Sequence, residues 1–193
     1  MRPIFITLLI TLASHAEATG IEKQWFVHPF GELRSYHGDW LAVCSKEETG
    51  NCRLVNYILM PGDSFYGHGG VFTFGFYKEN GKTKNYLDVN APGVEHPYGS
   101  SVVLTFDHVD VPIMADNILS GGIFSPSKNS SSIGRYEVYE TFSILNVELI
   151  VAIKNNMEKA RWLNLSYRNG QVQFSLRGFS SAYKAVKEIR YND

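Results

Sequence analysis

The stretch HGDWLAVCSKEETGNCRLVNY, residues His37–Tyr57, holds both cysteines of the 193-residue chain. Between the cysteines lies SKEETGN, a polar segment with a glycine, which has the composition of a turn. On either side, alternate positions carry residues suited to one core face: Trp40, Ala42 and Cys44 before the turn, and Cys52, Leu54 and Asn56 after it. This pattern predicts two antiparallel strands joined by a short turn.

The N-terminus has the organisation of a secretory signal peptide. Arg2 supplies a positive charge, Ile4–Leu12 is apolar apart from two threonines, and Ala16-Glu17-Ala18 fits the small-residue cleavage pattern. Nine residues are too few to cross a hydrocarbon core, which needs about 20. We therefore expect cleavage after Ala18 and export to the periplasm or cell envelope, or secretion. The alternative is a disordered apolar start to a cytosolic protein.

Export to an oxidising compartment makes a disulfide the default state of two cysteines. We predict a Cys44–Cys52 bond across the hairpin, with the two Cα atoms within about 4.4–6.8 Å of each other. A redox site would need C-x-x-C at the start of a helix, and two lone cysteines make a poor metal site. The predicted role of the pair is structural.

Composition limits the classes of partner. Loss of residues 1–18 removes Arg2 and Glu17, so the formal net charge stays at −1, and about 175 residues remain as one domain, 19–193. This balance gives no nucleic-acid signature. One basic stretch, Lys159–Arg190, carries seven Lys or Arg against the single acid Glu188. It is either a set of solvated faces or a docking surface for anionic partners.

Further strands follow the hairpin, separated by turn signals every 8–12 residues. Asn80-Gly81 and Asn169-Gly170 are strong hairpin turns. The predicted strands are Val71–Tyr77, Asn85–Val89, Ser101–Phe106, Leu149–Ile153, Trp162–Tyr167 and Gln171–Leu176. In two of them alternate residues share a face: Phe72, Phe74 and Phe76 in one, and Val172, Phe174 and Leu176 in the other. Short strands at this spacing predict an all-β antiparallel sandwich or barrel.

Two segments have helical features. Near the C-terminus, apolar residues recur with helical spacing, which predicts a short amphipathic helix over one sheet edge: Phe179, Ala182, Tyr183, Val186 and Ile189. Gly178 precedes it, and Ser180 or Ser181 is expected to cap it. Tyr136–Asn146 fits a helix or a strand equally, because its Val, Tyr, Phe and Ile residues suit both.

Few motifs point to chemistry. The histidines form no zinc motif, and no nucleophile elbow, P-loop or dinucleotide-binding motif is present. Asp107, His108 and Asp110 form an oxygen-rich cluster that is either a weak cation site or, more simply, a polar strand end. The glycines of YGHGG, residues 66–70, are expected in a loop before a strand. A Ser-His-Asp triad assembled from distant loops stays open. We predict no catalytic residue, cofactor or metal site.

Three motifs in order resemble the invasion-associated locus B family. GDWLAVC…NCRLV at residues 38–55 is similar to its opening, LDVNAPGV followed by VVLTFD to its midsection, and VQFSLRGFSSAYKAV to its closing segment. Together they span about residues 36–187. Members commonly carry a second cysteine pair after the midsection aspartate, whereas residues 111–125 here contain no cysteine.

The resemblance implies an exported protein of Gram-negative, mostly alphaproteobacterial cells with an immunoglobulin-like β-sandwich. Founding members are linked to the invasion of host cells, notably erythrocytes, and no catalytic residues belong to the family. The leading hypothesis is a non-enzymatic envelope protein that binds an unidentified envelope or host-surface protein, with residues 65–70 (FYGHGG) and the basic C-terminal segment as candidate surfaces. The alternatives are a small-ligand or carbohydrate-binding periplasmic protein and a cryptic hydrolase.

Overall fold

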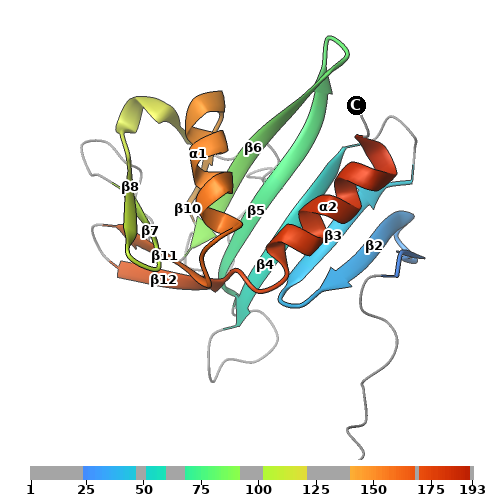
Figure 1. Ribbon diagram of the computed structural model, residues 1–193, viewed down its shortest axis with the longest axis horizontal. Helices are drawn as coiled ribbons and strands as arrows, with labels where there is room; N and C mark the ends of the chain where they lie inside the picture. Colours follow the sequence, from blue (N-terminus) through green and yellow to red (C-terminus); the bar gives the residue numbers. More distant parts are fainter. Residues whose placement is uncertain are drawn as a thin grey trace, which may run out of the picture.

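The computed structural model describes residues 24–46, 51–59, 68–91, 102–120, 140–167 and 170–191. They form two antiparallel β-sheets, two α-helices and a short 3-10 helix (Figure 1). The predicted signal peptide, residues 1–18, lies outside the described residues. Within the described ranges, neither helix has the length and apolar character needed to span a membrane.

The larger sheet has eight strands. In spatial order they are β1 (Phe26–Val27), β2 (Glu32–His37), β3 (Trp40–Ser45), β4 (Cys52–Leu59), β5 (His68–Glu79), β6 (Lys82–Ala91), β10 (Glu140–Ile144) and β9 (Ile118–Ser120). The first six follow one another in chain order, so each pairs with its sequence neighbour. This part of the sheet is a meander built from successive hairpins.

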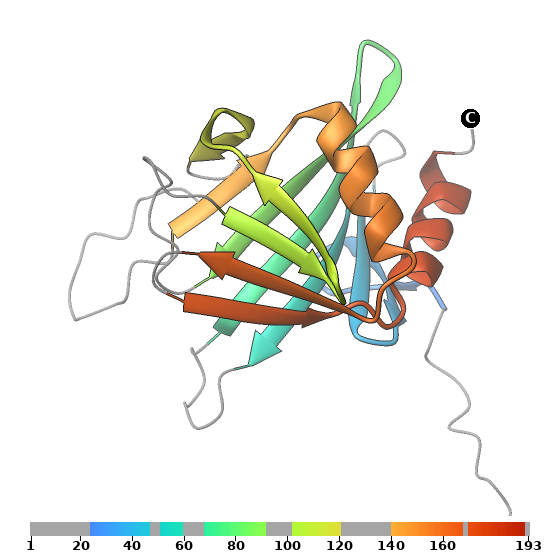
Figure 2. The same ribbon diagram turned by 60° about the vertical axis from the view of Figure 1, so that its left-hand side comes forward.

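The smaller sheet has four strands. In spatial order they are β12 (Gly170–Ser175), β11 (Trp162–Tyr167), β7 (Val102–Phe106) and β8 (Val109–Ile113). The 3-10 helix η1 (Ala115–Asn117) follows β8, α1 (Val147–Met157) precedes β11, and α2 (Phe179–Arg190) follows β12. The smaller sheet and both helices pack on one face of the larger sheet, which we call its inner face (Figures 1 and 2).

The inner face carries the alternating residues that the sequence pointed to. Phe72, Phe74 and Phe76 of β5 are all fully buried there, and Phe72 lies 5.4 Å from Phe174 of the smaller sheet, centroid to centroid. Burying a side chain of this size contributes about 1.5–3 kcal/mol. The core is therefore a continuous aromatic and aliphatic layer between the two sheets, and the predicted all-β antiparallel sandwich with a C-terminal amphipathic helix is confirmed.

The predicted hairpins are confirmed at the level of strand pairing. Asn80 and Gly81 both have positive φ, 51° and 76°, and connect β5 to β6. β11 pairs with β12 as predicted, but Gly170 lies opposite Tyr167 and begins β12 instead of forming part of the turn; residues 168–169 lie outside the described residues. The segment that suited either a helix or a strand contains strand β10, with its first four residues, 136–139, also outside them.

One strand prediction is wrong. Leu149–Ile153 belongs to helix α1, not to a strand. Asn146 is the N-cap, and its side-chain oxygen accepts a hydrogen bond from the Leu149 N–H at 3.0 Å. The buried residues Ile150, Ile153 and Met157 then recur at helical spacing and face the core. The apolar run alone did not reveal this period, because the run is shorter than two helical turns.

Helix α2 is joined to the hairpin between β2 and β3 at its N-terminal end. The backbone N–H of Asp39 donates to the Arg177 carbonyl at 3.0 Å, and the Asp39 carboxylate accepts from the Arg177 guanidinium at 2.6 Å. The indole N–H of Trp40 donates to the Ser175 carbonyl at 3.0 Å, and the Asn56 amide donates to the same oxygen at 2.8 Å. We call this set of contacts the α2 junction.

Gly178 is required at the α2 junction. It has φ of +96°, and a Cβ added there would lie 1.9 Å from the His37 carbonyl oxygen. Gly178 itself is the N-cap of α2, so the predicted cap by Ser180 or Ser181 is wrong. The Ser181 hydroxyl instead contacts His37 Nδ1 at 3.0 Å, which ties the first turn of the helix to β2.

Trp40 and the Phe179 region share one core. Their ring centroids lie 5.0 Å apart, with the planes inclined at 64°. Phe179 also contacts Phe74 and Tyr183. The predicted apolar stripe of α2 is buried at Phe179, Ala182 and Val186, whereas Ile189 at its end is exposed.

Candidate functional site

The face of the larger sheet opposite the core holds a groove. It has a volume of about 780 Å³ and lies beside the β1–β2 turn, over the outward-facing residues of β4, β5 and β6. Its lining residues are Phe30, Gly31, Glu32, Ser45, Asn51, Cys52, Arg53, Val55, Tyr57, Val71, Thr73, Tyr86 and Asp88. This volume lies within the range of about 300–1,000 Å³ typical of small-molecule sites.

The β1–β2 turn places an aromatic side chain at the mouth of the groove. The N–H of Gly31 donates to the His28 carbonyl at 2.8 Å, and the N–H of His28 donates to the Glu32 carbonyl at 2.7 Å, which closes a tight turn around Pro29 and Phe30. Phe30 remains 82% exposed, with the Arg34 guanidinium carbon 5.9 Å from its ring centroid. A single exposed aromatic residue is common on a protein surface, so the significance of Phe30 lies in its position on the groove, beside other aromatic and apolar lining residues.

A second aromatic residue on the groove comes from β4. Tyr57 is 51% exposed and points to the same face as Val55, because the two residues are two positions apart on one strand. Val55 lies opposite Thr73 of β5, and Tyr57 lies opposite Val71. These positions give the groove an apolar floor beneath an aromatic rim.

Tyr86 forms the side of the groove over a glycine. A Cβ added at Gly75 would lie 1.8 Å from the Tyr86 ring, so the ring rests directly on the Gly75 backbone. Burial raises the pKa of Tyr86 far above its usual value, and the negative charge of Asp88 adds to this, while Arg53 opposes it. The phenol therefore stays protonated at physiological pH and keeps its hydrogen-bond donor.

Charged residues along the groove are paired with each other. The Glu32 carboxylate accepts hydrogen bonds from Arg34 at 2.7 Å and from Arg53 at 2.8 Å. Burial acts to raise the pKa of Glu32, but the hydrogen bonds and positive charges of the two arginines outweigh it and lower that pKa overall. Both guanidinium groups are thereby held in fixed positions beside the groove.

Asp88 is the other acid of the groove. It is only 9% exposed and accepts a hydrogen bond from the Ser143 hydroxyl on the neighbouring strand β10. It lies opposite both Thr73 and Ser143 in the sheet register, so the three polar side chains form a row across the outer face. The groove therefore combines an apolar floor with oriented donors and acceptors.

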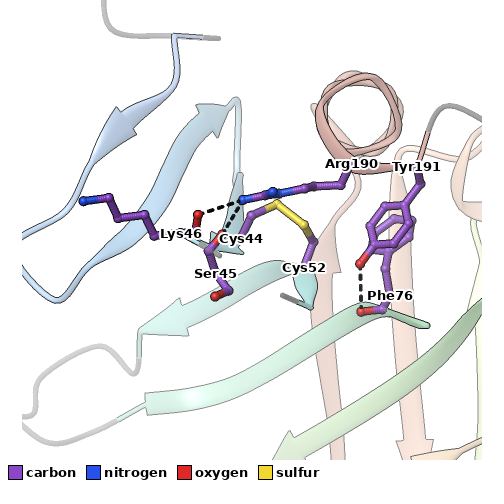
Figure 3. The surroundings of a disulfide bond; sticks show 7 residues. All are labelled: Cys44, Ser45, Lys46, Cys52, Phe76, Arg190 and Tyr191. Carbon is purple, nitrogen blue, oxygen red and sulfur yellow. Dashed lines mark hydrogen bonds between the residues drawn. A yellow bond between two sulfur atoms is a disulfide. The ribbon is translucent and has the colours of Figure 1, made fainter. Parts of the chain in front are cut away.

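The predicted Cys44–Cys52 disulfide is present and buried, next to the closed end of the β3–β4 hairpin (Figure 3). The Cα atoms lie 4.1 Å apart, slightly closer than the expected range. The reason is the pairing: Cys44 and Cys52 are directly opposite each other in an antiparallel ladder, and the ladder hydrogen bond is made by the adjacent pair, from the Ser45 N–H to the Asn51 carbonyl. Cys44 and Cys52 are thus a non-hydrogen-bonded pair, and the Cα atoms of such pairs approach to about 4.5 Å.

The C-terminal end of α2 contacts the same hairpin. Arg190 donates to the carbonyl oxygens of Ser45 and Lys46 at 2.7 and 3.3 Å (Figure 3). Tyr191 stacks on Phe76 with centroids 5.5 Å apart. These contacts show that the disulfide region is a structural joint between the helix and the sheet.

The acidic cluster around His108 is organised for the backbone. Both oxygens of the Asp107 carboxylate accept from the backbone N–H of Arg161 at 3.1–3.2 Å, and one also accepts from that of Trp162. Asp110 accepts from the Thr105 hydroxyl at 2.7 Å. Among the described residues, no three His, Cys, Asp or Glu side chains gather as a metal site would require.

One serine–histidine contact has a distance typical of nucleophilic catalysis. Ser35 Oγ lies 3.0 Å from His37 Nε2, and Ser181 Oγ lies 3.0 Å from His37 Nδ1. His37 is only 2% exposed and Ser35 is fully buried between α2 and the sheet. A substrate cannot reach this pair, so its role is to fix the α2 junction.

The two candidate surfaces from the sequence are only partly described. Residues 65–67 of FYGHGG lie outside the described residues, and residues 68–70 start strand β5 instead of ending a loop. The basic C-terminal segment is spread over separate structural roles: Arg177 pairs with Asp39, Arg190 caps the β3–β4 hairpin, and Lys184 lies 3.7 Å from Glu188.

Sequence reasoning missed the groove. The available signal was in the outward positions of β4, where Arg53, Val55 and Tyr57 alternate with the core residues. Apolar residues on both faces of one strand indicate that both faces bury surface. Phe30 and Glu32 gave no such signal, because a turn brings them to the groove.

Comparison with known proteins identifies no family for this chain. No family model, curated protein or solved structure matches the chain. The resemblance to the invasion-associated locus B family therefore rests on the three sequence motifs alone.

Proposed function

We propose that this chain is a non-enzymatic exported binding protein of the cell envelope, which holds a partner in the groove on the outer face of its larger sheet. The observation that carries the proposal is the groove itself: a hollow of about 780 Å³ with the highly exposed Phe30 at its mouth and Tyr57 on its rim. Aromatic residues at a concave site are the usual anchors of binding.

Export is supported by the chemistry of the cysteines. The Cys44–Cys52 bond is buried in the core, and disulfides of this kind persist in oxidising compartments. With the predicted signal peptide, this favours the periplasm or the cell envelope, or secretion. By its resemblance to the invasion-associated locus B family, the partner would be an envelope or host-surface protein, and binding would promote entry into host cells such as erythrocytes.

The second candidate is a small-ligand or carbohydrate-binding periplasmic protein. The groove favours it, because its volume of about 780 Å³ lies in the small-molecule range, whereas a flat protein interface needs no such hollow. Both candidates place binding in the same groove, so one set of variants examines both.

The test compares three forms of the mature chain. The wild type, a Phe30→Ala/Tyr57→Ala double variant and a Trp162→Ala control are cross-linked in envelope and host-membrane fractions, and bound molecules are identified by mass spectrometry. Trp162 is a matched control, because it is a 46% exposed aromatic residue on the smaller sheet. We expect the wild type and the control to retain a partner that the double variant loses. Equal recovery by all three forms, or none by any, would refute the proposal.

A further inference from the structure

We propose that the groove binds a short neutral saccharide, and that the partner is recognised through this saccharide. The inference rests on the proposed function and names the ligand class of the same site. Three features of the groove point to it: exposed aromatic faces, charged groups without an excess of positive charge, and a floor formed by the interior strands β4 and β5.

The aromatic residues supply flat apolar surfaces. Phe30 is 82% and Tyr57 51% exposed, and they come from different elements that border one hollow. A pyranose ring presents a C–H face that packs on an aromatic ring, while its hydroxyl groups point outward from the ring edge. Such a ligand removes the exposed aromatic area from water without burying its own polar groups against carbon.

The charged residues supply fixed donors and acceptors without an excess of positive charge. The lining holds the acids Glu32 and Asp88 and one base, Arg53, which pairs with Glu32; Arg34 pairs with Glu32 from outside the lining. Hydroxyl groups both donate and accept, which suits a site whose exposed charged groups are the Arg53 guanidinium and the Glu32 carboxylate. A phosphate or sulfate ligand would meet repulsion from the acids as well as attraction from the arginines.

Two other ligand classes fit less well. A lipid chain would cover the charged side chains with hydrocarbon, which costs several kcal/mol per unsatisfied group. A peptide strand that adds to a sheet needs unpaired backbone groups at an edge. β4 and β5 are both interior strands, paired on each side, so the groove floor has no such edge.

The test is a glycan array followed by calorimetry on the full mature chain. The array carries neutral oligosaccharides, including chitotriose, cellotriose and maltotriose, and anionic ones, including sialyllactose and a heparin-derived trisaccharide. We expect binding to at least one neutral glycan, with less than about a threefold change in Kd between low salt and 0.5 M NaCl, because the ligand carries no charge to screen.

Three single variants locate the binding. Phe30→Ala and Tyr57→Ala should each weaken Kd at least tenfold, and Trp162→Ala should leave it unchanged. Phe30→Ala keeps the test sound if Tyr57→Ala disturbs the sheet, because Phe30 lies in an exposed turn. A chain that binds no neutral glycan, prefers anionic glycans, or binds equally well in all variants would overturn the inference.

Failure of the saccharide inference can be told apart from failure of the proposed function. The cross-linking comparison is repeated on fractions treated with periodate, which cleaves vicinal diols of glycans. Groove-dependent recovery that survives periodate would keep the proposed function and refute the saccharide. Loss of recovery after periodate is the expected result, and no groove-dependent recovery before treatment would refute both.

Discussion

Gly178 allows the sharpest test of the α2 junction. Gly178→Ala imposes two costs: an unfavourable φ of +96° and a Cβ placed 1.9 Å from the His37 carbonyl oxygen. The left-handed conformation costs an L-residue about 1–2 kcal/mol. Moving packed groups to relieve a collision adds about 1–3 kcal/mol. We therefore expect a loss of about 2–5 kcal/mol in the free energy of unfolding.

Gly81→Ala is the matched control. Gly81 also has positive φ, +76°, but a Cβ there would meet nothing within 4 Å. The change in unfolded-chain entropy is the same for both substitutions and cancels in the comparison. We expect Gly81→Ala to cost about 1–2 kcal/mol, the backbone part alone.

Urea unfolding, followed by tryptophan emission, measures both variants. The midpoints should separate while the slope of free energy against urea stays the same, because the surface exposed on unfolding is unchanged. If the two variants lose the same free energy of unfolding within about 0.5 kcal/mol, the close approach of Gly178 to the β2–β3 hairpin leaves room for a Cβ, and our account of the junction is wrong.

Three further predictions concern stability. The double substitution Cys44→Ala/Cys52→Ala should lower the free energy of unfolding by about 2.5 kcal/mol, the value of the chain-entropy model for a separation of eight residues. A wild-type protein that unfolds at the same urea concentration with and without reductant would contradict this. Hydrogen bonding from Arg177 lowers the pKa of Asp39 in the folded state. The Asp39–Arg177 pair therefore stabilises the fold at neutral pH, and this stabilisation is lost as pH falls below about 3.8 through the lower folded-state pKa. Asp39→Asn should lower the free energy of unfolding by at most about 1 kcal/mol at pH 7, because the pair is exposed, and should have no effect near pH 2. A difference that persists at pH 2 would refute the ion-pair explanation. Asp107→Ala should cost about 1–2 kcal/mol and speed hydrogen exchange of the two N–H groups at the start of β11, whereas unchanged exchange would exclude the capping role.

The hairpins could be predicted from sequence because their signals are local. The alternation around Cys44 and Cys52, and the Asn80-Gly81 turn, each lie within one supersecondary unit. The period of two fixes which side chains face the core, so Phe72 was placed correctly on the buried face without any long-range information.

Helix α1 shows where such local reasoning fails. Leu149–Ile153 is a five-residue apolar run, and a run of that length fits a buried strand as well as a helix. The deciding residues lay outside the run. Asn146 caps the helix before it, and Met157 continues the buried stripe beyond it. A window extended by one turn in each direction would have detected the helical period.

The groove could not be predicted because it is assembled from distant segments. Glu32 and Arg53 are 21 positions apart in the chain but form an ion pair at 2.8 Å across β3, which separates their strands. Asp88 is buried by its position in the middle of the sheet, and nothing in its neighbouring residues distinguishes it from an exposed acid in an edge strand. Only the order of the strands brings these charges to one face.

The motifs that carry the family resemblance divide into two physical roles. Gly38–Trp40 of the opening motif contacts Ser175–Gly178 of the closing one, so these residues specify how α2 meets the sheet. Arg53 and Asp88, at outward positions of the opening and midsection motifs, belong to the groove. The rim residue Phe30 lies outside all three motifs. Of the floor residues, Val55 lies within a motif whereas Val71 and Thr73 do not. A chain that shares the motifs would therefore share the α2 junction and the charged positions Arg53 and Asp88, while the rest of the groove, including the rim at Phe30, is free to differ.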